Sequence, residues 1–346
     1  MGLLSGSTDF FGLDLGTTAA RIVQLSGNGP TKQLVKYAQV AINSDVASSD
    51  SNADQQKVAQ ALKELISTTR INTRDVAVGL PSNKVFTTVV DIDRLPVNEL
   101  ANAIHYQADS IIPTPIAESK LDWAVVGNSP KDKTKQEILL TSVTNEFIEK
   151  RLDMLESIGL NVIAFEPDNL ALSRALLSPD VANPQMVLDV GHKSTDIVIV
   201  MNGAPRLTRS IPTGVEAIIR SATQNLSIDA KRAEQFVFKF GLGEDKLEGQ
   251  IYNAIVGTVE IIMNDIQKSI KFFSSRYNGA TPERIIVSGA AVTMPDFPKY
   301  IANVTGLNVE IGNTWRNVTY PSNKTNELMA ISSNFGVAIG LAERKA

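Results

Sequence analysis

The spacing of apolar and polar residues divides the first part of the chain into strands and helices. Alternation over residues 10–15, 21–25 and 33–42 predicts three strands of a meander. Glycine-containing turns at 16–18 and 27–30 separate them. The polar stretch 45–54 is predicted to be a mobile loop, followed by a helix over 55–69 and a strand over 75–80. This alternation of strands and helices is typical of an α/β protein.

The pattern of apolar and polar residues changes after Pro81. Its pattern predicts a strand, a helix and two further strands at 84–92, 97–110, 119–126 and 136–144. We interpret this module, residues 81–144, as an insert. Beyond it, a helix is expected over 146–158 and a strand over 161–165, with another helix beginning at Glu166-Pro167.

The second part of the chain is richer in helix. Helices are predicted over 214–226, 229–240, 247–277 and 327–342, and a strand over 284–288. Within 247–277, apolar residues recur every three or four positions and form one stripe, which predicts a long helix packed on a core.

An internal repeat is the most informative feature of the sequence. Residues 13–30 read LDLGTTAARIVQLSGNGP and residues 188–205 read LDVGHKSTDIVIVMNGAP, and the two align without a gap. The aspartate and the glycine recur in register, at the end of a predicted strand and at the bend. Two interpretations remain open: two homologous half-molecules that open with the same β-hairpin, or two unrelated hairpins with common turn chemistry.

Length and composition narrow the function classes. A chain of 346 residues exceeds what one simple core supports, roughly 250–300 residues, so at least two domains are expected. The net charge of −4 and the scattered lysines and arginines argue against nucleic-acid binding.

The absence of cysteine and the presence of only two histidines, His105 and His192, exclude disulfides, thiolate catalysis and cysteine-ligated metal sites. No apolar run approaches the ~18–20 residues that span a bilayer, so a cytosolic location is expected.

The repeated hairpins offer chemistry suited to a polyphosphate. Glycine at a bend lets backbone amides approach an anion closely, and consecutive turn amides form a concave anion site. Gly16, Thr17 and Thr18 supply such a turn in the first hairpin. Asp14 and Asp189 are then expected to converge on Mg²⁺, which proteins commonly hold through water with one or two carboxylates and phosphate oxygens.

Two further features could contribute to this site. The turn Ser288-Gly289-Ala290 has small residues that would permit close approach of an adenosine, although a tight strand-to-helix turn explains it equally well. Glu166 could order an attacking water. The alternative for Glu166 is an acidic residue in the first turn of a helix, which the helix dipole favours.

Taken together, these segments resemble the actin, Hsp70 and sugar-kinase superfamily, and within it the PilM family of type IV pilus assembly, a relative of FtsA. The resemblance rests on both hairpins, on the 288–291 turn, and on the segments HYQADSIIP (105–113), LDW (121–123), FEP (165–167), SIKFF (269–273) and NFGVAIGLA (334–342). It implies an α/β fold of the actin-like (ribonuclease H-like) duplicated ATPase type, with two domains and an inserted FtsA/PilM-type subdomain.

The resemblance also implies a division into four subdomains. The first actin-like subdomain would comprise 9–80, 145–182 and 326–346, and the insert 81–144 would carry the partner groove. The second actin-like subdomain would comprise 183–228 and 283–325, with a helical subdomain at 229–282.

ATP and Mg²⁺ are the implied cofactors. The implied ATP-binding set is Gly12, Asp14, Gly16, Thr17, Thr18, Asp189, Gly191, His192, Lys193, Ser194, Gly214, Glu234, Ser288, Gly289 and Ala290, with Asp14 and Asp189 holding Mg²⁺ through water and Glu166 as the catalytic candidate. Two positions depart from the family pattern. Ala290 and Ala291 stand where relatives often have glycine and serine, and Val237 stands three residues after Glu234 where relatives commonly have lysine. Ala290 and Ala291 would crowd the base slightly and Val237 would leave a ribose or base contact missing, whereas the phosphate hairpins stay intact.

The function implied by the resemblance is that of a cytoplasmic ATP-binding adaptor, with at most slow ATPase activity. It would belong to the pilus inner-membrane platform and grip the N-terminal cytoplasmic peptide of PilN in a groove beside the insert. Its association with the inner face of the cytoplasmic membrane would then run through the partner alone, and its homo-oligomeric state stays open. Two alternatives are an FtsA-like filament-forming protein and a small-molecule kinase of the same fold.

Overall fold

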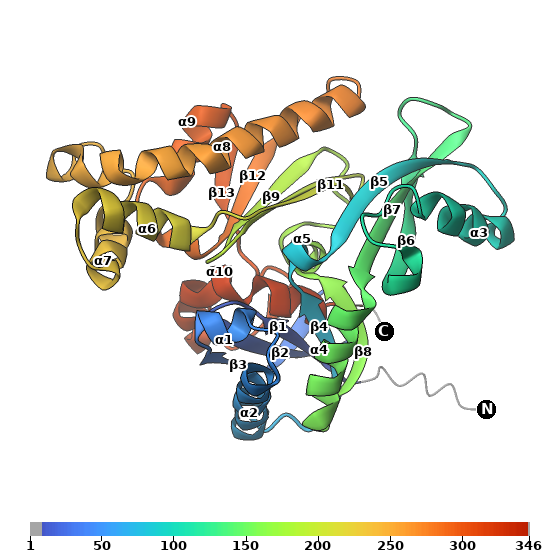
Figure 1. Ribbon diagram of the computed structural model, residues 1–346, viewed down its shortest axis with the longest axis horizontal. Coiled ribbons are helices and arrows are strands. Elements are labelled where there is room, and N and C mark those ends of the chain that lie inside the picture. Colours follow the sequence, from blue (N-terminus) through green and yellow to red (C-terminus); the bar gives the residue numbers. More distant parts are fainter. Residues whose placement is uncertain (1–8, 345–346) are drawn as a thin grey trace. The chain divides into compact units, whose positions relative to one another are not determined.

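The computed structural model describes residues 9–344, apart from the side chain of Val97 (Figure 1). Contacts divide the chain into two compact units. The first unit comprises Met1–Pro81, Glu146–Leu177 and Asn313–Ala346, and the second comprises Ser82–Asn145 and Ser178–Gly312. The finer division into four subdomains stays a prediction, and the last two residues of the range 326–346 lie outside the described residues.

A six-stranded sheet forms the centre of the first unit, in the order β14-β3-β2-β1-β4-β8. Its strands are β1 (Phe11–Leu15), β2 (Ala19–Ser26), β3 (Lys32–Ala41), β4 (Asp75–Leu80), β8 (Asn161–Pro167) and β14 (Val318–Thr319). The first three strands form the predicted antiparallel meander, and β4 and β8 continue the sheet in parallel.

Helices cover both faces of this sheet. Side chains of α2 (Asn52–Thr69) and α4 (Asn145–Ser157) pack with Phe11, Leu13 and Leu15 of β1. On the other side of the sheet, α10 (Thr325–Ala342) packs with Val23 and Leu25 of β2, and α5 (Asp168–Leu176) lies against α10. Burial on both faces explains why β1 reads as a continuous apolar run around a single aspartate.

The loop predicted over 45–54 was wrong. The structure has a short helix there, α1 (Ser44–Ser48), and α2 already begins at Asn52. The side chain of Asn43 accepts hydrogen bonds from the amides of Asp45 and Val46, and Ser51 caps α2 in the same way. Polar residues that suggested a loop are therefore helix N-caps, a role for which Asn and Ser are well suited.

The second unit repeats the topology of the first. Its five-stranded sheet has the order β11-β10-β9-β12-β13, with two antiparallel pairs followed by two parallel pairs, as in β3-β2-β1-β4-β8. The strands are β9 (Gln185–Val190), β10 (Thr195–Met201), β11 (Ala204–Ile211), β12 (Arg284–Gly289) and β13 (Asn308–Ile311). This common order confirms the duplication predicted from the repeat.

Register strengthens this conclusion. Leu13 pairs with Ile22 across the first hairpin, and the aligned residues Leu188 and Ile197 pair across the second. The two hairpins, β1–β2 and β9–β10, are therefore equivalent residue by residue.

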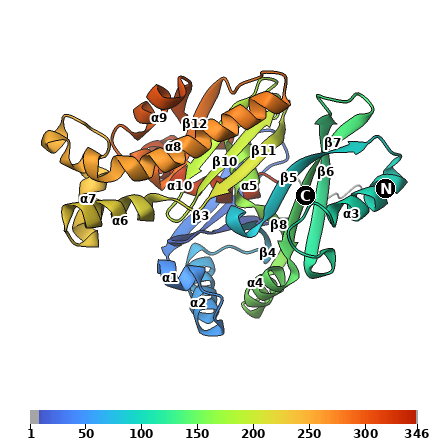
Figure 2. The ribbon, with the colours of Figure 1, turned by 45° about the horizontal axis from the view of Figure 1, so that its top comes forward.

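Four helices accompany the second sheet: α6 (Val215–Leu226), α7 (Ala230–Phe240), α8 (Gln250–Arg276) and α9 (Phe297–Thr305). The longest, α8, passes over the sheet in Figures 1 and 2, and its apolar stripe is buried in the core as predicted. It begins later than expected because Leu247 and Glu248 adopt positive φ angles in a separate turn. The pattern did not reveal β11, α9 or β13.

The 82–145 module, as we call this part of the second unit, has its own small sheet in the order β5-β7-β6. It contains β5 (Phe86–Asp93), α3 (Val97–Ala108), β6 (Ser119–Asn128) and β7 (Lys135–Thr144), which is the predicted order of elements. Leu100 and Ile104 of α3 pack against Ile138 and Leu140 of β7, and Figure 2 shows α3 beside this sheet. In the described residues, no helix is both long and apolar enough to cross a membrane.

Candidate functional site

The first hairpin holds a buried aspartate beside an arginine. Asp14 lies near the end of β1 and is only 5% exposed. Arg21 lies directly opposite on β2, with its Nη1 3.3 Å from Asp14 Oδ2. Burial raises the pKa of Asp14, and the charge and hydrogen bond of Arg21 oppose that rise. The first hairpin therefore carries a charge-compensated pair rather than a lone carboxylate.

The turn of the first hairpin is accessible and lies close to Arg21. Gly16 and Thr17 are partly exposed and Thr18 is exposed. A Cβ atom on Gly16 would lie 3.0 Å from the Ala19 carbonyl oxygen and 3.3 Å from Arg21 Nη1. This crowding shows that the guanidinium group lies next to the bend. A ligand at this turn would meet backbone, two hydroxyl groups and a cation.

Gly12 has a different role from the other glycine of this hairpin. It is buried within β1, and a Cβ atom there would lie 2.2 Å from the Ala338 carbonyl oxygen of α10. Close packing of α10 explains the glycine. The structure thus places Gly12 in the core, where it supports the hairpin without facing a ligand.

Glu166 is held by two arginines. It lies on β8, and α5 begins only at Asp168, so the alternative of an acidic first-turn residue was wrong. The Glu166 carboxylate accepts hydrogen bonds from both terminal nitrogens of Arg174, and its Oε2 lies 3.3 Å from Arg344 Nη1. Glu166 itself is buried, whereas the side chains of Arg174 and Arg344 are 35% and 41% exposed, so the cluster as a whole is only partly buried.

The second hairpin is closed by the start of a helix. The amide of Gly191 donates to the Ser194 carbonyl across the turn, at 2.9 Å. The first amides of α6, those of Val215 and Glu216, donate to the carbonyls of Gly191 and His192. Gly214 allows this approach, since a Cβ atom there would lie 2.5 Å from the His192 carbonyl oxygen.

The turn after β12 joins this second hairpin. Ser288 is fully buried opposite Asp189 in the parallel β9–β12 pair. Gly289 has a φ of +87°, and a Cβ atom there would lie 2.4 Å from Asp189 Oδ1, so a glycine is required on both grounds. Ala290 follows in the same turn. The structure therefore brings the predicted residues Asp189, Gly191, His192, Lys193, Ser194, Gly214, Ser288, Gly289 and Ala290 into one half-site.

Asp196 is a functional candidate that the sequence reasoning did not assign. It lies directly opposite Asp189, at the repeat position that Arg21 occupies in the first hairpin. Burial raises the pKa of Asp196 to about 6, and the neighbouring hydroxyls of Ser210 and Ser82 lower it by a smaller amount. Comparison of the two repeats at this position was the signal that could have identified both residues.

Glu234 belongs to none of these turns, because it lies within helix α7. It is exposed on α7, which packs against α6, the helix that closes the second hairpin. Its expected adenosine contact stays a prediction.

Metal and phosphate fit the two hairpins unequally. Within residues 9–344 no group of three or more metal-ligating side chains gathers, so Mg²⁺ would need phosphate oxygens and water to complete its shell. The second hairpin offers two facing carboxylates, whereas a guanidinium group neutralises the carboxylate of the first. This donor set suits a cation bound together with a phosphate.

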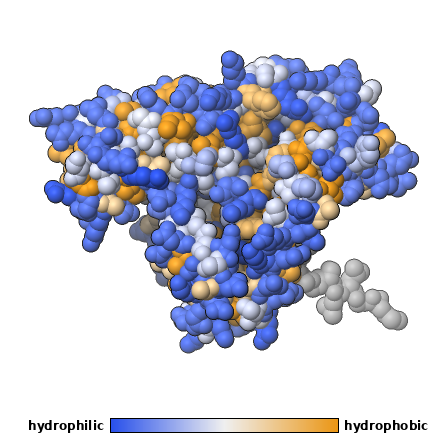
Figure 3. Space-filling model, in the orientation of Figure 1, coloured by the Kyte–Doolittle hydropathy of each residue, from blue (hydrophilic) through white to orange (hydrophobic). Residues whose placement is uncertain are grey.

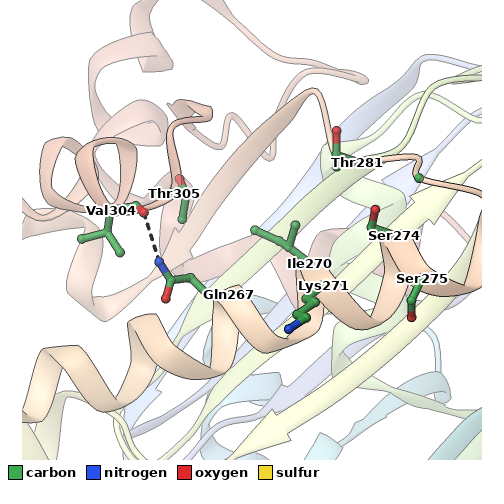
Figure 4. A pocket seen from close by; sticks show the side chains of 9 residues that line it. Gln267, Ile270, Lys271, Ser274, Ser275, Thr281, Val304 and Thr305 are labelled. Atoms are coloured by element: carbon green, nitrogen blue, oxygen red, sulfur yellow. Dashed lines mark hydrogen bonds between the residues drawn. The ribbon is translucent and has the colours of Figure 1, made fainter.

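An open hollow of about 560 Å³ lies elsewhere in the second unit, between α8 and α9. Figure 4 shows Gln267 donating a hydrogen bond to the Val304 carbonyl at its rim, with Lys271 nearby. None of the predicted site residues lines it. On the face shown in Figure 3, hydrophobic residues are scattered among hydrophilic ones rather than gathered at one place.

Comparisons with known proteins agree with this fold. A family model described as type IV pilus assembly protein PilM matches residues 12–346. The cell division protein FtsA of Neisseria meningitidis serogroup B is 31% identical over 96 residues. That match covers 28% of this chain and 23% of that protein, so the chain matches less than a quarter of the length of this relative.

Two solved structures have a similar fold. A chain of a PilM-PilN type IV pilus biogenesis complex has a TM-score of 0.83 at 23% identity, with 97% of this chain and 98% of that chain covered. MreB 5 of Spiroplasma citri bound to AMPPNP has a TM-score of 0.56 at 14% identity, with 96% and 95% covered. These likenesses confirm the actin-like duplicated fold that the sequence predicted.

Proposed function

Because the chain belongs to the PilM family of type IV pilus assembly proteins, we propose that it is an ATP-binding adaptor of the pilus inner-membrane platform. In this role it grips the N-terminal cytoplasmic peptide of PilN and acts at the inner face of the cytoplasmic membrane through that partner. A PilM-PilN complex among the structures with this fold supports the partner.

Nucleotide binding rests on one observation above all: both halves of the duplicated fold present an aspartate followed two residues later by a glycine at the turn, in the same register. Turn amides, the hydroxyls of Thr17 and Thr18, and the guanidinium group of Arg21 are suited to phosphate. A protein of this fold has been solved with AMPPNP, which supports the choice of ATP.

Magnesium belongs to the same proposal. Bound Mg²⁺ would neutralise phosphate charge, held through water by Asp14 and Asp189. Burial raises the pKa of Asp14, and the nearby positive charge of Arg21 opposes that rise. Gly289 leaves room for the carboxylate of Asp189.

Binding is proposed to matter more than turnover. Glu166, the candidate for ordering an attacking water, has its carboxylate engaged by Arg174 and Arg344. A carboxylate whose two oxygens already accept from guanidinium groups would have to give up one of those hydrogen bonds to order a water. Hydrolysis is therefore expected to be slow.

Calorimetry of Mg-ATP binding tests the nucleotide part. The double variant Asp14→Ala/Asp189→Ala is expected to abolish the binding isotherm. As a matched control, Glu149→Ala/Glu156→Ala removes two exposed carboxylates of α4 and is expected to bind as the wild type does. Unchanged affinity in the first variant would refute the assignment of the hairpins.

Titration with a synthetic peptide from the start of the cognate PilN tests the partner. Tyr106 of α3 is 86% exposed, which makes it the most accessible aromatic side chain of the 82–145 module. Tyr106→Ala is expected to weaken binding about tenfold or more, as loss of an aromatic anchor does. Phe272→Ala, which removes an exposed aromatic of α8, serves as the control. Equal affinity in wild type and Tyr106→Ala would remove Tyr106 from the proposed groove.

The local match to FtsA favours filament formation as a second candidate function. Sedimentation with and without Mg-ATP separates the two. A nucleotide-dependent pellet would favour filaments, and a protein that stays in the supernatant would favour the adaptor.

A further inference from the structure

One face of β11 connects the second sheet to the 82–145 module. β11 is the edge strand of its sheet, and Arg206, Thr208 and Ser210 alternate along it, which places them on a common face. Arg206 Nη1 lies 3.0 Å from Glu137 Oε2 of β7, and Thr208 Oγ1 donates to the Thr87 carbonyl of β5 at 3.2 Å. The sheet edge is thus covered by the module.

Glu137 is the centre of this contact. It is 1% exposed and accepts hydrogen bonds on both oxygens. Oε1 accepts from Arg276 Nη2 at 2.9 Å and from the Tyr277 hydroxyl at 2.7 Å, while Oε2 accepts from Arg206. Arg276 Nη2 also donates to Asp91 of β5 at 3.0 Å. Each hydrogen-bonded pair here joins the module either to β11 or to the end of α8.

The charges of this group balance only when both parts are in place. Glu137 and Asp91 come from the module, whereas Arg206 and Arg276 come from the rest of the second unit. Glu137 and Arg206 are almost fully buried and Arg276 and Asp91 partly so, and removing one partner of a buried pair within the packed structure is strongly unfavourable. Gly127 of β6 makes room for the pair, because a Cβ atom there would lie 2.6 Å from Arg206 Nη2.

The same face of β11 leads toward the second hairpin. Ser210 is two residues beyond Thr208, and its hydroxyl lies beside Asp196, which faces Asp189. Ser82, the first residue of the module, also lies beside Asp196. The side chain of Asp196 therefore lies between the second hairpin and the module.

We propose that the cluster of Glu137, Arg206, Arg276, Tyr277 and Asp91, centred on the buried Glu137, is a clamp that makes the 82–145 module and the second sheet open as one cooperative body. The clamp gives the module a stable position on the sheet that carries the second hairpin. A second step rests on the proposed function. The effect of nucleotide binding at the second hairpin is transmitted through the clamp to the module that receives the partner peptide.

Native-state hydrogen exchange of the full chain in increasing urea tests the clamp without any ligand. In the wild type, the slowest amides of β7 and of β9–β10 are expected to share one opening reaction with the same urea dependence. The variant Arg206→Met leaves the buried Glu137 carboxylate without one of its two cationic partners and leaves the Arg276–Asp91 pair intact. In it, β7 is expected to exchange at least about 100-fold faster than β9–β10, because removing one partner of a buried ion pair is strongly destabilising.

Three results decide the matter. A β7 to β9–β10 exchange ratio that stays the same in Arg206→Met would overturn the clamp, as would separate opening in the wild type. Glu146→Gln/Lys150→Gln, which removes an exposed ion pair of α4, is the control and is expected to leave the ratio unchanged. Should Arg206→Met fail to fold, Tyr277→Phe, which removes only the hydroxyl bond to Glu137 Oε1, provides the measurement with a smaller shift in the same direction.

Adding Mg-ATP then tests the second step. In the wild type, protection is expected at β9–β10 and at β5 and β7 alike, and in Arg206→Met only at β9–β10. Module protection that persists in the variant would overturn the transmission. If Mg-ATP protects neither region in the wild type, the proposed nucleotide function fails, while the urea experiment still decides the clamp.

Discussion

Arg21 lies directly across the first hairpin from Asp14, with 3.3 Å between Nη1 and Oδ2, and the equivalent position of the second hairpin is occupied by Asp196. The two halves of the duplicated fold therefore differ in charge at the same place. One half pairs its aspartate with a cation, and the other faces it with a second acid. Cation binding is expected to favour the second hairpin and anion binding the first.

Loss of Arg21 should destabilise the first unit. Arg21→Met leaves the Asp14 carboxylate buried without its cation, and breaking such a pair costs about 3 kcal/mol. Urea unfolding at pH 7 measures the loss. Asp14→Asn/Arg21→Met, in which neither charge remains, is expected to recover most of it, and a double variant as unstable as Arg21→Met would contradict the charge argument.

Asp196 should make stability depend on pH. Its folded pKa, about 6, lies above the usual 3.8, so the native state holds a proton that the unfolded chain releases. The contribution of Asp196 to the free energy of unfolding is fully present below pH 3.8 and is lost as the pH rises through about 6. Asp196→Asn should therefore be more stable than wild type by about 1–2 kcal/mol at pH 7.5, after allowance for partial exposure, and by little near pH 4.

Urea unfolding of both proteins at the two pH values checks this expectation. The exposed Asp180 provides the control, since Asp180→Asn should give the same difference from wild type at both pH values. An Asp196→Asn protein less stable than wild type at pH 7.5 would show that the carboxylate is stabilising in its ionised form.

Two helical glycines should respond oppositely to alanine. In α10, a Cβ atom on Gly340 would lie 1.8 Å from the Ala171 carbonyl oxygen of α5. Gly340→Ala must push the two helices apart and should cost about 2–3 kcal/mol. Gly257 in α8 has nothing within 4 Å of such a Cβ, so Gly257→Ala should add about 0.5–1 kcal/mol through its helix propensity. Thermal unfolding that ranks both variants alike would contradict the packing of α10 on α5.

Glu166→Gln should affect stability more than turnover. Glutamine lacks the negative charge that pairs with both Arg174 and Arg344. Loss of a partly buried ion pair of this kind should lower the free energy of unfolding by about 1–3 kcal/mol. The residual rate of ATP hydrolysis should change less than about threefold, because both carboxylate oxygens are already engaged by Arg174 and Arg344 and are not directed at a water. A rate that falls a hundredfold with unchanged urea unfolding would instead assign Glu166 to catalysis.

Local patterns predicted much of the fold. The meander of the first unit, the strand–helix–strand–strand module and the buried stripe of α8 all follow from spacing of apolar residues, since the period of the pattern reports the element. The ungapped repeat predicted the duplicated hairpins because their equivalence is a property of aligned residues. Short or edge elements such as β13 and α1 were not predicted. They have too few residues to set a hydrophobic period, and they depend on helix caps and on neighbouring strands.

The repeated hairpins, with an aspartate at each strand end and a glycine at each bend, could be predicted from the amino-acid sequence because they are local in the chain. The contacts of Glu137 with Arg206 and Arg276, and of Glu166 with Arg344, become apparent only in the folded chain. These partners lie far apart in sequence, so no local spacing encodes their approach. Burial then fixes the energetic weight of each charge, and burial exists only once the sheets and helices have packed.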